Sequence, residues 1–110
     1  LGRPVARYGA IRETLLEMER KIDAGRLLCW NAAYMSDAGR PNSKEASMAK
    51  LEASRTAVFC GKEAVQIHGG AGYTKEFPVE RWFRDARVTE IYEGPTEIQN
   101  LVIAREILKA

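Results

Sequence analysis

The sequence predicts an all-α fold, an up-and-down helical bundle of two long helices plus a short helix and a C-terminal helix. Three observations predict this fold. Apolar and small residues recur at spacings of three and four along most of the 110 residues. Glycine and proline stand between the periodic segments, and no run alternates with the period of two that a half-buried strand requires.

Composition narrows the classes of function. Hydrophobic residues make up 45% of the chain and charged residues 29%, as in ordinary globular domains. Seventeen Lys and Arg against fifteen Asp and Glu give a net charge of +2, too small to favour nucleic acid as a partner. No apolar run approaches the roughly 18 residues of a membrane span. Two cysteines and one histidine cannot build a disulfide framework or a zinc site, so we expect no metal and a reducing, intracellular compartment.

The first long helix is expected from about residue 5 to residue 38. A stripe with the spacing 4, 3, 4, 3, 4, 3 runs along it: Ile11, Leu15, Met18, Ile22, Gly25, Cys29 and Ala32. Gly39 supplies a C-terminal cap, and Pro41 cannot continue the helix. Cys29 and Cys60 are predicted to be small core residues.

The second helix is expected from residue 43 to about residue 68. Asn42 and Glu45 resemble a capping box at its start. Small residues form its inner face: Ala46, Ala49, Ala53, Ala57, Cys60, Gly61 and Ala64. Glycine inside a helix costs about 1 kcal/mol relative to alanine. We therefore expect close packing or a ligand at Gly61.

A glycine-rich segment at residues 68–73 breaks the helical pattern. Pro78 begins a short helix that is expected to end near Asp85. Gly94 and Pro95 open the last helix, and one face of it carries Ile98, Leu101, Val102, Arg105 and Leu108.

Two of these connections hold candidate functional residues, and each has two interpretations. The glycine segment lacks the dinucleotide-binding fingerprint, because Lys75 takes the place of its last glycine and a helix precedes it. A helix-ending turn is therefore favoured, although exposed N–H groups without side chains also suit a cofactor. Glu93 stands on a bend between Tyr92 and Gly94. The residues alone favour a carboxylate that complements the helix dipole, with catalysis as the alternative.

Taken together, the segments 64–73, 78–81, 84–86, 91–94, 97–99 and 102–105 resemble the acyl-CoA dehydrogenase family in order and spacing. The likeness is to the C-terminal helical domain and includes the start, Leu1 to Pro4. It implies that residues 1–110 are one domain of a longer protein, whose N-terminal helical domain and middle β-domain are absent from this chain. The start without methionine or signal peptide agrees with such a fragment.

The family resemblance implies α,β-dehydrogenation of an acyl-CoA thioester, with Glu93 as the base that takes the α-proton. While the base takes that proton, the β-hydrogen passes as hydride to flavin N5. The cofactor implied is FAD. The residues implied to contact it are Gln66, Ile67, His68, Gly69 and Gly70, typically from a neighbouring subunit, and Pro95, Thr96 and Glu97 after the base.

The resemblance also implies that Gly94 lies beside the thioester and Arg105 near the CoA moiety. Two positions depart from the family pattern, since Pro95 replaces the usual threonine and Gly9 stands where glutamine is common. The implied partners are an acyl-CoA substrate, electron-transfer flavoprotein as electron acceptor, and further copies in a dimer or tetramer. The implied location is the cytoplasm in a bacterium or the mitochondrial matrix in a eukaryote.

The main alternative to the enzyme is a non-catalytic helical oligomerisation module derived from the same fold. Glu93 beside Tyr92 and Gly94 argues against this alternative, because a module without chemistry has no need for that carboxylate. The fragment alone is expected to be inactive.

Overall fold

The computed structural model describes residues 2–109, so the resemblance noted at Leu1 lies outside the described residues, as does Ala110. All regular structure in residues 2–109 is helical, which confirms the predicted fold class. It consists of a 3₁₀ turn, Val5–Arg7, and the helices α1 (Gly9–Asp37), α2 (Ser43–His68), α3 (Gly70–Tyr73), α4 (Val79–Val88) and α5 (Thr96–Leu108).

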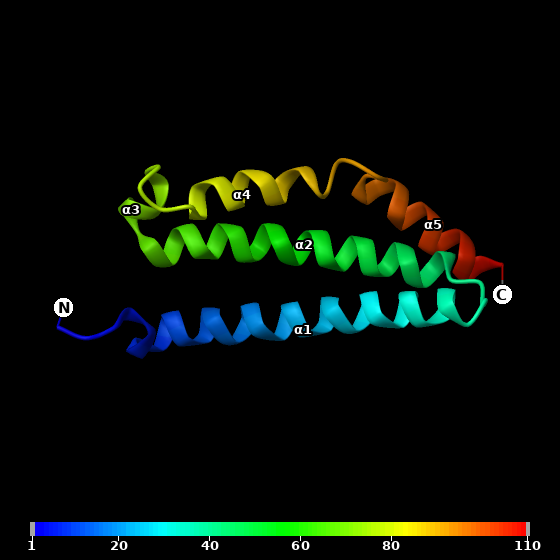
Figure 1. Cartoon of the computed structure of the whole chain (residues 1–110), viewed down its shortest axis with the longest axis horizontal. Helices are drawn as coiled ribbons and strands as arrows, with labels where there is room; N and C mark the ends of the chain where they lie inside the picture. The colour runs from blue at the N-terminus through cyan, green and yellow to red at the C-terminus, as the bar shows by residue number, and fades with distance from the viewer. Residues whose placement is uncertain (1, 110) are drawn as a thin grey trace.

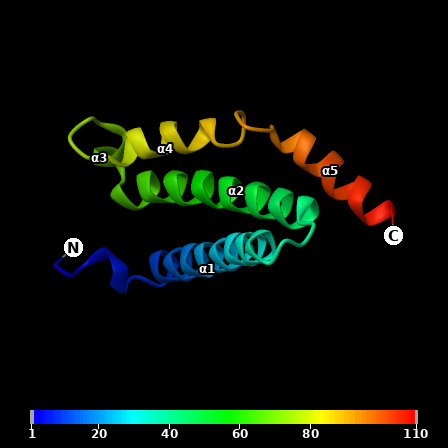
Figure 2. The same cartoon turned by 45° about the vertical axis from the view of Figure 1, so that its right-hand side comes forward.

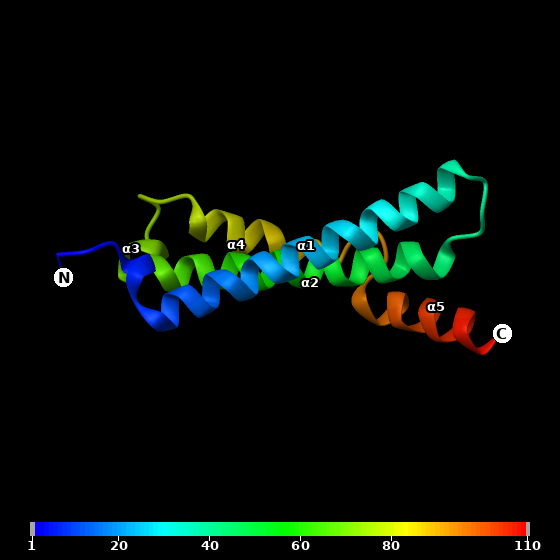
Figure 3. The same cartoon turned by 90° about the horizontal axis from the view of Figure 1, so that it is seen from below.

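Helix α2 is the element against which the other helices pack. Helix α1 runs antiparallel along one side of it, and α4 and α5 follow one another along the opposite side (Figures 1 and 2). Seen from below, α1 crosses α2 obliquely (Figure 3). The third arm of the up-and-down bundle is thus divided between α4 and α5, and the molecule measures 57 × 24 × 24 Å.

Glycines allow α2 its close approach to two neighbours. A Cβ added at Gly25 of α1 would lie 3.7 Å from Ala53 Cα. A Cβ added at Gly61 of α2 would lie only 3.0 Å from Phe83 Cα in α4. Close helix packing therefore accounts for the glycine at position 61. Ala49 is buried, whereas Ala46 at the end of the expected small-residue face is exposed.

The α1–α2 connection is fixed by hydrogen bonds that the sequence indicated only in part. Gly39 has φ +66, and the N–H of Gly39 and of Arg40 donate to the carbonyls of Ser36 and Met35 at 3.0 and 2.9 Å. These bonds form a Schellman motif and confirm the glycine cap. The predicted capping box is wrong. The Asn42 side chain instead donates to the Ala32 carbonyl at 2.8 Å, because its backbone is not in the extended conformation of an N-cap.

Two helix boundaries differ from the prediction. Helix α1 begins at Gly9 rather than residue 5, because Tyr8 is extended at ψ 137 while the Arg3 guanidinium lies 4.2 Å from the centre of its ring. Helix α4 continues to Val88, three residues beyond Asp85. The glycine segment does break the long helix, but it also contains the single turn α3.

The helices of this chain leave much of their apolar surface uncovered. Within residues 2–109 the buried hydrophobic residues are few, and none has a large side chain: Ala32, Ala49 and Val79. On α1, Leu16, Leu27, Trp30 and Tyr34 are 61–69% exposed. The prediction that Cys29 lies in the core is wrong, and Cys60 is half-buried. Four residues of a helix turn through about 400°, so Cys29 falls some 40° to one side of Gly25, at the edge of the contact with α2.

Candidate active site

The bend after α4 places Glu93 in an unusual backbone conformation. Its φ is +52, and it is the one non-glycine residue with positive φ in residues 2–109. Gly94 follows with φ +94. A side chain in the left-handed region costs roughly 1–3 kcal/mol, so the surrounding structure must hold it there. The Tyr92 N–H donates to the Val88 carbonyl and the Thr96 N–H to the Glu90 carbonyl, at 3.1 and 3.2 Å, and these two bonds close the bend.

The bend leaves both functional groups of Glu93 available. The side chain is exposed, and the backbone N–H makes no hydrogen bond within residues 2–109. Residue 93 precedes the N-cap of α5, which is Pro95, and Glu97 is the acidic residue in the first turn of that helix. The helix-dipole interpretation therefore fits Glu97 better than Glu93.

Glu93 borders a shallow hollow of about 300 Å³ between α2 and the bend. Its lining is mostly apolar, because small residues of α2 form the floor. The lining residues are Lys50, Ala53, Ser54, Ala57, Thr89, Tyr92 and Glu93. A carboxylate at the rim of such a hollow can accept a proton from a molecule lying in it.

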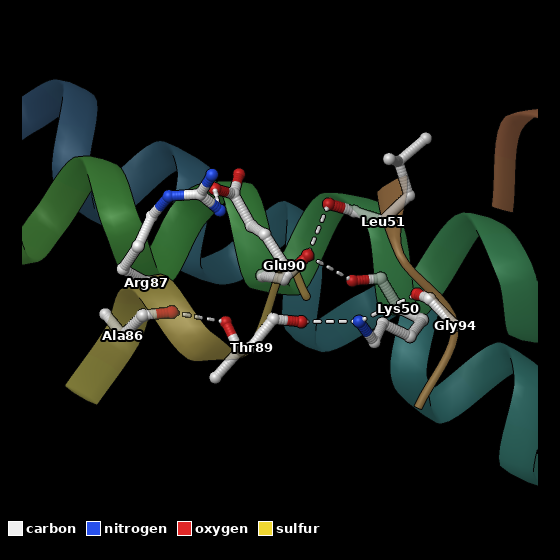
Figure 4. Close-up of polar contacts among 8 residues, drawn as sticks. Lys50, Leu51, Ala86, Arg87, Thr89, Glu90 and Gly94 are labelled. Carbon is white, nitrogen blue, oxygen red and sulfur yellow. Dashed lines mark hydrogen bonds and ion pairs between the residues drawn. The ribbon is translucent and has the colours of Figure 1, made fainter. Parts of the chain in front are cut away.

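Lys50 of α2, which lines the hollow, reaches the bend with its side chain (Figure 4). Its ammonium donates to the carbonyl of Thr89 and, at 3.2 Å, to the carbonyl of Gly94. Gln99 of α5 donates to the same Gly94 carbonyl at 3.2 Å. Sequence reasoning missed Lys50. The available indication was its position one turn after Ala46 and one turn before Ala53, a charged residue on a face of otherwise small ones.

The residues after Glu93 line a second hollow, on another side of the bend. Pro95, Thr96 and Glu97 border about 480 Å³ together with Arg55, Arg87, Glu90 and Ile91. The Arg87 guanidinium pairs with Glu90 at 3.0 Å. Gly94 is half-buried between the two hollows, and Arg105 lies further along α5, exposed and 3.3 Å from Glu106. Gly94 thus adjoins Glu93 in the chain, whereas Arg105 lies on α5.

The glycine turn lies at the other end of α4. Gln66, His68, Gly69 and Gly70 are exposed and Ile67 is half-buried. A Cβ added at either exposed glycine would meet no atom within 4 Å. The His68 ring is held by a 2.8 Å hydrogen bond to the Ala64 carbonyl and by Phe77, with 5.3 Å between ring centres. The His68 side chain thus forms a hydrogen-bonded end of α2.

The two groups of expected flavin contacts are far apart within one copy of the chain. Lys50, which contacts Gly94, precedes His68 by 18 residues on the same helix. At about 1.5 Å per residue this is roughly 27 Å along the axis of α2. Gln66–Gly70 and Pro95–Glu97 therefore form two separate surfaces.

A family model described as the acyl-CoA dehydrogenase C-terminal domain matches residues 1–108. The chain belongs to the acyl-CoA dehydrogenase family. It is 50% identical over 108 residues to acryloyl-CoA reductase (NADH) of Anaerotignum propionicum, and 50% identical over 109 residues to the mitochondrial short-chain specific acyl-CoA dehydrogenase of Bos taurus. The butyryl-CoA dehydrogenase structure from Megasphaera elsdenii is similar with a TM-score of 0.95 at 41% identity.

These relatives are much longer than the chain. The two curated proteins are matched over 98% and 99% of this chain but over 27% and 26% of their own length. The butyryl-CoA dehydrogenase structure is covered over 28% of its chain, against 98% of this one. The acyl-CoA dehydrogenase chain described here thus spans about a quarter of the relatives it matches.

The surfaces of this acyl-CoA dehydrogenase domain are compatible with an anionic dinucleotide such as FAD. The glycine turn offers exposed backbone without side chains, which allows close approach. The second hollow holds Arg55 and Arg87 beside Glu90 and Glu97, and a neighbouring hollow of about 750 Å³ along α4 holds Lys75, Arg84 and Arg87 beside Glu80. Guanidinium groups suit phosphate. These residues fit the cofactor that the family resemblance implies.

Two other classes of site are absent from the part of the chain that the structure describes. In residues 2–109, no three potential metal ligands of the His, Cys, Asp and Glu type lie together. None of the helices in that range combines the length and the hydropathy needed to cross a membrane.

Proposed function

We propose that this chain is the C-terminal domain of an FAD-dependent acyl-CoA dehydrogenase, and that Glu93 is its catalytic base. The observation that carries the proposal is the conformation of the Glu93 bend. A positive φ turns a carboxylate residue out of the helical path at the rim of a mostly apolar hollow, with its own N–H unbonded within the described residues. Family membership over residues 1–108 supports the reaction class.

The chemistry proposed for this chain is proton removal from a carbon next to a thioester. That proton is weakly acidic, so the thioester carbonyl must be polarised while the Glu93 carboxylate takes the proton. The Glu93 N–H, unbonded within residues 2–109, is suited to donate to that carbonyl, and Gly94 is proposed to lie beside the thioester. FAD, when bound, supplies the acceptor for the hydride that leaves the β-carbon.

Two surfaces are proposed to hold the cofactor. Pro95, Thr96 and Glu97 would contact it beside the base, and Gln66, Ile67, His68, Gly69 and Gly70 would contact it from a neighbouring subunit. Their separation along α2 supports this division, because one copy presents them in two places. Arg105 is proposed to lie near the CoA moiety, whose phosphates would compete with Glu106 for its guanidinium.

Self-association and further domains are part of the same proposal. Leu16, Leu27, Trp30 and Tyr34 of α1 leave large apolar side chains in contact with solvent, which is unfavourable for an isolated domain. We expect subunit contacts and the remaining domains to cover such surfaces in a dimer or tetramer. The rival proposal, a non-catalytic oligomerisation module, accounts for these surfaces but not for the conformation at Glu93.

Electron-transfer flavoprotein is the proposed acceptor, because a reduced flavin must be reoxidised before the next turnover. The proposed location is the mitochondrial matrix in a eukaryote, as the name of the Bos taurus relative suggests, or the cytoplasm in a bacterium. The Anaerotignum propionicum relative is named for reduction, so both directions of the reaction belong in the test.

The test uses the full-length protein with its bound cofactor. A flavin absorbance spectrum is recorded, and a panel of acyl-CoA thioesters is then mixed with it under anaerobic conditions. Bleaching of the flavin band by one class of thioester is expected, and an enoyl-CoA should restore the band. Absence of flavin, or no bleaching with short, long, branched and aromatic thioesters, would contradict the proposed function. The 110-residue chain alone is expected to show no acyl-CoA oxidation.

A further inference from the structure

The bend at Glu93 depends on contacts from outside its own segment. After α4 ends at Val88, residues 89–95 have no regular secondary structure, and Glu93 occupies the left-handed region. Local hydrogen bonds run from residues 89–92 back to residues 86–88, and from Thr96 to Glu90. None of these bonds involves the peptide groups on the two sides of Gly94.

Lys50 provides the contacts that the bend does not supply itself. Its ammonium binds the Thr89 carbonyl, before Glu93, and the Gly94 carbonyl, directly after it (Figure 4). The side chain is half-buried, and the Tyr92 ring centre lies 5.8 Å from the nitrogen. Within residues 2–109 it has no carboxylate within ion-pair distance. Both hydrogen bonds that its ammonium makes within residues 2–109 therefore go to the bend.

The helix that carries Lys50 is firmly placed. One turn further along α2, Ala53 contacts the glycine at position 25 of α1, and Gly61 contacts Phe83 of α4. Lys50 therefore links a helix packed on both sides to a segment without regular structure. Gln99 adds a second donor to the Gly94 carbonyl, but from α5, which has no buried residue.

We propose that Lys50 is a positioning residue for Glu93: its ammonium, bound to carbonyls on both sides of that residue, fixes the backbone from which the carboxylate reaches the substrate. The inference rests on the proposed function of Glu93. Lys50 does not accept the α-proton in this scheme. Its loss would leave the carboxylate present but displaced, and small displacements of a reacting group have large effects on rate.

The experiment compares Lys50→Met, Lys50→Arg and Lys62→Met with the wild type, each as the full-length, cofactor-bound protein. Methionine keeps the length and apolar stem but donates no hydrogen bond, whereas arginine keeps charge and donors. Lys62 is the matched control, because it lies on the same helix, is 61% exposed, and contacts its own helix through the adjacent Glu63 and the Phe59 ring. Single-turnover flavin bleaching and amide hydrogen exchange of residues 89–99 are measured, together with KM.

For Lys50→Met we expect bleaching to slow by about 10- to 100-fold while KM changes by less than about threefold, since placement and not binding is impaired. Exchange in residues 89–96 should accelerate by about tenfold or more, because their bonds open more often. Lys50→Arg should recover part of both losses, and Lys62→Met should match the wild type. If Lys50→Met loses its cofactor, Lys50→Gln replaces it, with smaller changes in the same direction.

The inference would be overturned if residues 89–96 of the Lys50→Met variant exchanged their amide hydrogens at the wild-type rate. It would also be overturned if that variant bleached its flavin at the wild-type rate. An equal effect of Lys62→Met would also overturn it, because the loss would then be general to α2. Failure of the proposed function is distinguishable from these results. If no thioester bleaches the wild type, Glu93 loses its proposed role, while the exchange comparison still decides whether Lys50 holds the bend.

Discussion

The two turns that flank α4 are held in opposite ways. The glycine turn is fixed by neighbours in sequence. Gly69 donates to the Gln66 carbonyl at 3.1 Å, Gly72 to the Gly69 carbonyl at 2.9 Å, and His68 is bonded to Ala64. The Glu93 bend is held in addition by Lys50, which precedes its two partners by 39 and 44 residues.

This difference separates what a short motif encodes from what the fold must supply. A turn closed by bonds over three or four residues can form wherever its own sequence occurs. A bend whose carbonyls are bound by a distant ammonium has its observed conformation only after the helices have packed. The glycine turn is therefore a local feature, and the Glu93 bend is a product of the whole domain.

The largest expected effect tests whether proton removal depends on the Glu93 bend and not on the glycine turn. Glu93→Gln in the full-length protein should lower the rate of flavin bleaching by about 10²- to 10⁴-fold while the cofactor stays bound, because an amide cannot accept the α-proton. Glu93→Asp should retain some activity. Glu76→Gln, which alters an exposed glutamate just after the glycine turn, serves as control and should leave the rate unchanged. Bleaching of Glu93→Gln at the wild-type rate would show that Glu93 is not the base.

A second prediction compares glycines with positive φ in the two turns. Alanine at Gly69 or Gly94 should cost about 1–3 kcal/mol of stability, because both positions are in the left-handed region. At Gly94 the added Cβ would also displace the Gln99 amide and its hydrogen bond, for roughly 1 kcal/mol more. Gly94→Ala should therefore unfold at the lower denaturant concentration. Equal midpoints for the two variants would contradict this order.

A third prediction concerns the packing that brings Lys50 to the bend. Gly61→Ala places a Cβ against the backbone of Phe83, and the overpacking should outweigh the helix propensity gained, for a net loss of about 1–2 kcal/mol. Gly25→Ala meets only an ordinary contact with Ala53 and should gain about 0.5–1 kcal/mol. Urea unfolding measures both changes, and a stabilising Gly61→Ala would mean that α4 adjusts without strain.

The smallest expected effect uses the Cys60 thiol to report on the contact between α2 and α4 at Gly61. Burial raises the pKa of Cys60, and only the thiolate reacts with iodoacetamide. At pH 7–8 Cys60 should therefore react more slowly than the exposed Cys29 in the unmodified domain, with a rate that rises with pH. Gly61→Ala, by loosening α4, should bring the rate at Cys60 closer to that at Cys29. Labelling followed by mass spectrometry gives both rates, and faster reaction at Cys60 than at Cys29 would contradict the prediction.

Features encoded locally were predictable from the sequence. The Gly39 cap, the two long helices and the break at the glycine segment each follow from residues that are neighbours in the chain. At Glu93 the sequence indicated that the chain bends, but not how the bend is held. The resemblance of several linked segments then indicated the family, and the match over residues 1–108 confirmed it.

Features that depend on the packing of distant segments were not predictable. The side chain of Asn42 bonds to Ala32, ten residues earlier, and so cannot cap its own helix. Cys29 fits a helical stripe, yet it lies at the edge of the contact with α2 and is exposed. In the sequence Lys50 is one of many charged residues. Its role becomes visible only in the structure, where the carbonyls of Thr89 and Gly94 lie beside it.

The unbroken run of α2 from Ser43 to His68 has a consequence for how such a domain can change over time. Inserting or deleting one residue between Lys50 and His68 would rotate one end relative to the other by about 100° and shift it by about 1.5 Å. A substitution in α2 alters the contacts of one residue. A one-residue insertion or deletion within the helix would instead move Lys50 away from the bend, or move the glycine turn away from the subunit that it is proposed to contact. The number of residues in this helix should therefore be more strictly maintained in evolution than the identity of most of them.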